Sequence, residues 1–126
     1  MAEIGLKLRT AAPSGDWRSF VVTAETPGAV AGAMDLIHDT VGVYAQNADD
    51  GEEVAFIYHA EKIVVPKSTT TGAGEFDAGD KVFYDPTDHE VNNDAPGNLW
   101  CGIALEKVGV DDCEVLIDLK GDKAHS

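Results

Sequence analysis

The chain has 126 residues, 44% of them hydrophobic, and a formal net charge of −14. This length suits one domain with a single core. The excess of carboxylates argues against a nucleic-acid partner, and the lack of an 18-residue apolar run argues against a membrane partner. No signal-peptide pattern opens the sequence, so we expect synthesis and assembly in the cytoplasm.

The first 18 residues differ from the rest in charge. Three cations outnumber two carboxylates there, so this segment sums to +1 and the remaining residues to −15. We predict an N-terminal arm over residues 1–18 that docks on a partner, followed by a single β domain over residues 19–126. An ordinary frayed terminus is the alternative. The predicted partner contacts in the arm are Ile4, Leu6, Lys7, Leu8, Arg9, Trp17 and Arg18.

Helix signals are scarce after this arm. The best candidate, "GAVAGAMDLIHD", contains two glycines and has no clear cap, so we expect at most one helical turn there. Short β-prone runs bounded by Gly, Pro, Asn and Asp fill the rest. They predict an all-β fold, a small barrel or sandwich of short antiparallel strands and hairpins. The predicted strands are Ser19–Thr23, Met34–Ile37, Val41–Tyr44, Glu53–His59, Ile63–Pro66, Lys81–Asp85, Leu99–Leu105 and Glu114–Leu119.

The alternation of residues along the last two predicted strands indicates which face of each strand points into the core. In "LWCGIAL" the residues 99, 101, 103 and 105 share one predicted core face, and in "EVLIDL" the residues 115, 117 and 119 do the same. Between the earlier strands, "DPTDHEV" has Asp85 and Pro86 at the first two positions of a type I turn. We therefore predict a hairpin in which His89–Val91 returns beside Lys81–Asp85.

The stretch "GEFDAGDKVFYD" comes close to a phosphate-binding loop. Gly74 and Gly79 have the spacing of that motif, which then requires lysine and a serine or threonine. The chain instead has Asp80 and Lys81, and it continues into a β-prone run rather than a helix. Nucleotide binding and an ATPase or recombinase activity are therefore disfavoured.

Other catalytic or metal-binding patterns are also missing from the sequence. The histidines lack metal-site spacing, and the carboxylates are too many for a catalytic pair to be singled out. We expect no enzyme activity, no catalytic residue, no cofactor and no bound metal. We expect Cys101 and Cys113 to be free, buried thiols. The four histidines are His38, His59, His89 and His125.

The C-terminal half resembles a known family. The segment "AGDKVFYDPTDHEVNNDAPGNLWCGIALEKVGVDDCEVLIDLKG" has Ala-Gly before a Val-rich strand, an Asp-containing hairpin, an Asn before a glycine-containing strand, and a final alternating strand. The segment "VGVYAQNADDGEEVAFIYHAEKIVVPKS" fits more loosely through its Asp-Gly-Glu turn and its Pro-Lys after a strand. These features resemble small phage capsid decoration, or cement, proteins, a family often labelled as RecA/RadA-type recombinases.

The resemblance implies a structural role similar to that of lambda-type head decoration proteins. Such proteins form homotrimers at threefold or quasi-threefold positions on the outside of the expanded head. The resemblance implies that the arm contacts the major capsid protein and neighbouring copies, and that the protein ends on the virion surface. The competing hypothesis is a soluble metal-binding or regulatory β module that uses the acidic loops.

Overall fold

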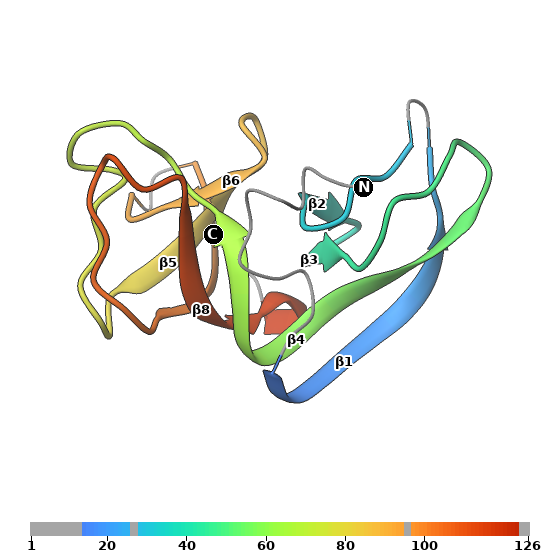
Figure 1. The fold of residues 1–126 in the computed structure, drawn as a ribbon, viewed down its shortest axis with the longest axis horizontal. Helices are drawn as coiled ribbons and strands as arrows, with labels where there is room; N and C mark the ends of the chain where they lie inside the picture. Colours follow the sequence, from blue (N-terminus) through green and yellow to red (C-terminus); the bar gives the residue numbers. More distant parts are fainter. Residues whose placement is uncertain (1–13, 26–27, 95–96, 124–126) are drawn as a thin grey trace.

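The computed structural model describes residues 14–25, 28–94 and 97–123 (Figure 1). Within them the chain forms eight strands and one short 3₁₀ helix. The fold is all-β, as the sequence predicted. The elements are β1 (Ser14–Thr23), β2 (Met34–Ile37), β3 (Thr40–Tyr44), β4 (Glu53–Pro66), β5 (Lys81–Asp85), β6 (Glu90–Asn92), β7 (Leu99–Ala104), β8 (Glu114–Lys120) and η2 (Gly121–Lys123).

The strands form one antiparallel sheet that curls into a nearly closed barrel. Its order is β2-β3-β4-β8-β7-β5-β6, and β1 pairs with β4 outside this path. The curl brings β6 back to the end of β4, where Lys67 and Val91 form an isolated bridge and the Ser68 amide donates to the Val91 carbonyl over 2.8 Å. The predicted hairpin is therefore present as β5 and β6. We call the place where β6 meets the end of β4, and the barrel closes, the seam.

The barrel interior is filled mainly by aliphatic side chains, together with the aromatic rings of Phe76 and Tyr84. The alternation of β8 is confirmed, because Val115, Ile117 and Leu119 are fully buried and the residues between them are only partly buried. Tyr84 from β5 is fully buried as well. The core cluster consists of Met34, Val41, Val43, Ile57, Ala60, Ile63, Val65, Phe76, Val82, Tyr84, Val91, Cys101, Ala104, Val115, Ile117 and Leu119.

The predicted face of β7 is wrong in its second half. Val82 of β5 pairs with Gly102 and Phe83 pairs with Trp100, so Cys101 is the extra residue of a bulge. Beyond the bulge the alternation reverses. Ala104 consequently lies in the core, and Ile103 faces outward.

The runs Glu53–His59 and Ile63–Pro66 were predicted as separate strands, but they are two parts of the continuous β4. The β4 register is irregular opposite Arg18 and Ser19 of β1, and again opposite β8 between Ala60 and Ile63. Such irregularities bend a strand and increase its twist. Figure 1 shows the result: the N-terminal part of β4 bends away from β8 and runs beside β1, while β3 pairs with it at Phe56 and Ile57. We call β1 and its partner residues 53–62 the ribbon.

The ribbon begins earlier than the sequence predicted. β1 starts at Ser14 rather than Ser19, so Trp17 and Arg18 lie in a strand, paired with Ala60 and His59. The remaining predicted contacts, from Ile4 to Arg9, fall outside the described residues. The division into an arm and a domain at residue 18 stays a prediction.

A second, smaller core lies where the ribbon meets β2 and β3. It contains Ala24, Ala29, Ala48 and Val54, with Val22 and Tyr44 packed against it. The glycine-rich segment before β2 forms part of this region through the pairing of Ala29 with Ala48. Residues 28–39, for which the sequence allowed at most one helical turn, contain turns and β2 and no helix.

Candidate functional site

β1 carries the largest group of exposed apolar side chains in the described part of the chain. Trp17 is 48% exposed, Phe20 37% and Val21 64%. Within the described residues β1 pairs only with β4, so no described strand pairs with its second edge. A long apolar edge strand of this kind is a template for another extended chain. The exposed edge and faces of β1 are the candidate site.

Aromatic contacts support this strand from one side. The Phe20 ring lies 5.5 Å from that of Phe56 and 5.4 Å from that of Tyr58, and Phe56 lies 5.3 Å from Tyr44. Phe56 is fully buried, so Phe20 rests on a fixed base although its outer side is exposed. Offset or tilted aromatic pairs at such distances are favourable. The exposed strand is therefore held in position before any partner arrives.

The charge of β1 differs from that of the whole chain. Its one carboxylate, Asp16, is matched by one cation, Arg18, whereas the chain carries 23 acidic and 9 basic residues. A neutral apolar strip lets a partner approach without meeting the field of the acidic body. β1 contains neither the lysines nor the prolines that commonly protect edge strands from pairing.

A second apolar surface lies on the outer side of β5 and β7. Phe83, Trp100 and Ile103 line a shallow groove of about 390 Å³ together with Gly79 and Lys81. The β7 bulge creates this groove, because it turns Ile103 to the same side as Trp100. Plain alternation would have placed Ile103 in the core, which is why the sequence did not reveal the groove.

The loop that resembles a phosphate-binding motif uses its amides internally. The Gly72 amide donates to a carboxylate oxygen of Glu75 over 2.9 Å, and the Asp77 amide donates to Asp80 over 2.7 Å. A strand, β5, follows the loop instead of a helix. The amides of Gly74, Glu75, Phe76 and Gly79 donate to backbone carbonyls, so the backbone donors of this loop are engaged within the protein itself.

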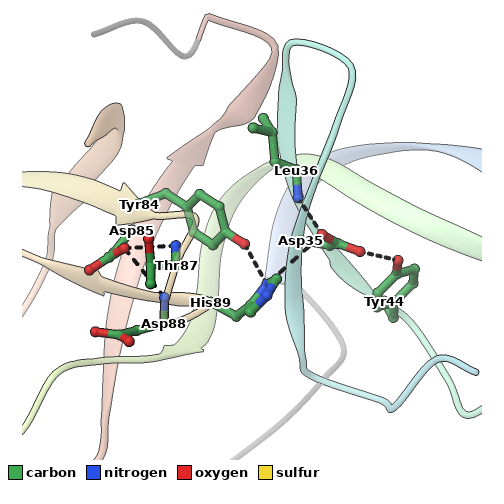
Figure 2. Close-up of polar contacts among 8 residues, drawn as sticks. All are labelled: Asp35, Leu36, Tyr44, Tyr84, Asp85, Thr87, Asp88 and His89. Atoms are coloured by element: carbon green, nitrogen blue, oxygen red, sulfur yellow. Dashed lines mark hydrogen bonds and ion pairs between the residues drawn. The ribbon is translucent and has the colours of Figure 1, made fainter. Parts of the chain in front are cut away.

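An open cleft of about 790 Å³ separates the β2–β3 hairpin from the turn between β5 and β6. Figure 2 shows its polar cluster: Tyr84 points at His89, and Asp35 lies between the His89 ring and Tyr44. The Tyr84 hydroxyl lies 3.0 Å from His89 Nδ1, and an Asp35 oxygen lies 3.9 Å from the same nitrogen. Both contacts therefore use one ring nitrogen. A catalytic triad requires two, so this geometry does not form a proton relay.

Lys67 is buried at the barrel seam, only 2% exposed, and follows the proline of the Pro-Lys motif. Its Nζ donates to the carbonyl oxygens of Ser68 over 2.7 Å and Asp112 over 2.6 Å. Burial lowers the pKa of this amine, an effect that the nearby Asp112 carboxylate opposes. The contacts tie the end of β4 to the turn before β8, so this part of the motif is structural.

The two cysteines are free, but only one is buried. Cys101 lies in the barrel core, and burial raises the pKa of its thiol to about 12. Cys113 is exposed in the turn before β8, so its predicted burial is wrong.

No three His, Cys, Asp or Glu side chains in residues 14–25, 28–94 and 97–123 gather as metal ligands would. The same ranges contain no helix long and apolar enough to span a membrane.

Comparison with protein families decides between the remaining possibilities. The family model for phage cement proteins matches residues 14–119. The chain belongs to the phage cement protein family. None of the curated proteins compared with the chain matches it. The matched region begins with the first residue of β1 and ends within β8, so it spans the ribbon and the barrel together.

Family membership confirms the resemblance drawn from the sequence. This cement protein is a structural component of the virion that binds the phage capsid and stabilises it. Its family is structural rather than enzymatic. The sequence identified Trp17 and Arg18 on the candidate strand but missed Phe20 and Val21. The run "FVV", which has no polar residue to face solvent, was the available signal.

Proposed function

We propose that the protein binds the outside of the expanded phage head as homotrimers at threefold or quasi-threefold positions and holds the capsid lattice together. The supporting observation is the exposed apolar edge of β1 in a member of the cement family. The partners are the major capsid protein and neighbouring copies of this chain. No catalysis, cofactor or metal takes part in this role.

The proposed contact is strand addition along β1. An extended segment of the partner pairs with the free edge, and its side chains cover Trp17 and Val21, which are both exposed. The predicted arm residues Ile4 to Arg9 precede β1 in the chain and extend the contact. Each contact is small, but many copies on one shell act together, so the lattice gains far more stability than one site supplies.

The distribution of charge supports an orientation in which the acidic part of the chain faces away from the shell. The arm and β1 are neutral to basic, whereas the rest of the chain is strongly acidic. With β1 against the shell, the acidic surface faces solvent. Particles coated in this way repel one another and remain dispersed.

Binding to expanded heads that lack the protein tests the proposal. A double substitution, Trp17→Ala with Val21→Asp, removes the apolar contact and places a charge on the strand without touching the barrel core. We expect at least tenfold weaker binding, because buried aromatic anchors dominate interfaces of this kind. Deleting residues 1–13, which leaves β1 intact, should weaken binding separately.

The matched control is Val30→Asp, at an exposed apolar residue outside β1. It should bind like the wild type. Wild-type binding by the β1 double variant would overturn the proposed contact. A copy number in purified virions far below one per major capsid protein would overturn the proposed coating role.

A further inference from the structure

The groove on the outer side of β5 and β7 is an apolar surface that the proposed strand addition on β1 does not use. Phe83, Trp100 and Ile103 line it, and all three side chains are partly exposed. Strand pairing fixes its shape, because Phe83 pairs with Trp100 and the bulge turns Ile103 to the same side. A preformed apolar groove of about 390 Å³ favours aliphatic side chains as its occupant.

One row of the sheet leads from the start of β1 to this groove. Ser14 of β1 pairs with Lys62 of β4. β4 pairs with β8 on both sides of this level, Asp118 of β8 pairs with Ile103, and Ile103 pairs with Lys81. Three strand spacings of about 4.8 Å therefore separate Ser14 from Ile103, which is roughly 15 Å along the surface of the sheet.

Residues 1–13 precede β1 and lie outside the described chain. Their sequence places Ile4, Leu6 and Leu8 at alternate positions, which share one face of an extended segment. Leu8 is six residues before Ser14, and Ile4 is ten residues before it. An extended chain covers about 3.3 Å per residue, so these side chains can lie roughly 20–33 Å from Ser14. The segment is thus long enough to reach the groove of its own barrel and to turn on the way.

Charge favours the same occupant. Residues 1–13 sum to +1, whereas residues 14–126 sum to −15. Asp118, the cross-strand neighbour of Ile103, lies between inward residues of β8 and is partly exposed on the outer face. A cationic segment is attracted to such a face, but the acidic body of a second copy is repelled by it.

We propose that residues 4–8 lie in the groove of their own chain while the protein is free, with their three aliphatic side chains on its three apolar residues. The segment then crosses β4 and β8 as a strap on the outside of the barrel. The strap removes apolar surface of both partners from water. It concerns the free protein, so it holds or fails independently of the proposed shell contact, which would draw the segment out of the groove.

Tryptophan fluorescence of the full chain tests the strap. The chain has two tryptophans, so Trp17→Phe leaves Trp100 in the groove as the single reporter. The test variant adds Ile4→Ser, Leu6→Ser and Leu8→Ser, which lie outside the barrel. We expect this variant to emit at longer wavelength and to be quenched more strongly by acrylamide, because Trp100 loses its cover.

The matched control, Glu3→Ser with Thr10→Ser in the same background, changes polar residues of the same segment. It should leave the emission and the quenching of Trp100 unchanged. Equal quenching with and without the three aliphatic side chains would overturn the proposal. Protection of Trp100 that disappears on dilution would also overturn it, because the occupant would then be a second copy.

Limited trypsin digestion reads the same contact from the side of the groove. The strap should slow cleavage after Arg9, and mass spectrometry of the released peptide measures the rate. Ile103→Glu places a charge in the groove and should speed this cleavage, whereas Val30→Glu, at an exposed residue outside the groove, should not. Equal rates in the two variants would contradict the strap.

Discussion

The barrel and the ribbon are built from the same kind of strand, but they differ in what covers their side chains. In the barrel, the inward residues of β8 and β5 are fully buried by strands on every side. In the ribbon, the side chains from Asp16 to Val21 on β1 are exposed, and Phe20 rests on only one aromatic layer. The buried side chains of the barrel therefore stabilise the fold, whereas the β1 strand of the ribbon presents an exposed surface.

The division follows from the shape of β4. Its C-terminal half lies between β8 and the seam, and its N-terminal half carries β1 out of the barrel. One strand thus belongs to both regions, so a force applied to β1 would reach the barrel through the β1–β4 hydrogen bonds and the continuous backbone of β4. This connection suits a protein that must stay folded while it holds a lattice together.

The largest expected effect is on the barrel. Ile117→Ala removes a fully buried side chain from the centre of β8. It should lower the free energy of unfolding by about 2–5 kcal/mol, the usual cost of such a cavity. Urea unfolding followed by tryptophan fluorescence measures it. The ribbon comparison is Val21→Ala, which should change the free energy of unfolding by less than about 0.5 kcal/mol.

A smaller effect is expected where the ribbon rests on its aromatic layer. Phe20→Ala should cost about 1–2 kcal/mol, because the ring is partly exposed but stacks on Phe56 and Tyr58. Phe20→Leu is the matched variant, since it keeps apolar volume and loses only the ring contacts. A cost for Phe20→Ala as large as that of Ile117→Ala would mean that the ribbon is part of the stabilising core.

The two cysteines test how firmly the barrel is closed, without disturbing the fold. Cys113 is exposed and should react with a thiol reagent within minutes at neutral pH, whereas Cys101 is in the barrel core with a pKa of about 12 and should react only when the barrel opens. Cys113→Ser isolates the slow thiol. Rapid labelling of Cys101 in that variant would show that the barrel core opens locally with ease.

The sequence predicted the strands of the barrel better than their faces. Turn residues and alternation located β2, β3, β5 and β8 correctly, because these strands have regular pleats. The β7 bulge at Cys101 and the joining of two runs into β4 could not be predicted, since they depend on how partner strands are offset. Local sequence contains no information about that offset.

Functional candidates show the same limit of prediction from the sequence. Trp17 was predicted as a contact because it is an apolar residue in a polar terminus, and it is indeed exposed. The cluster of Asp35 with His89 joins residues from separate hairpins, 54 positions apart in the chain. No spacing rule connects them, so only the folded barrel brings them together.

The smallest expected effect concerns the seam where the barrel closes. Burial first, and then the carboxylates of Asp88 and Asp85, raise the pKa of Glu90 on β6 above its ordinary value, and Lys67 partly offsets this. The folded protein therefore holds a proton on Glu90 at pH values where the unfolded chain has lost it. Stability should fall as the pH rises from the unfolded pKa through the folded pKa, and it should level off above.

Glu90→Gln removes this titration and keeps the size of the side chain. The variant should be slightly more stable than the wild type near neutral pH, and the difference should shrink as the pH falls below the ordinary pKa of a glutamate. Paired urea midpoints at several pH values measure it, with Glu53→Gln on the exposed end of β4 as the control. If Glu90→Gln and Glu53→Gln gave the same pH dependence, the seam would be as open to solvent as the ribbon. The contrast between the two regions would then not extend to the place where the barrel closes.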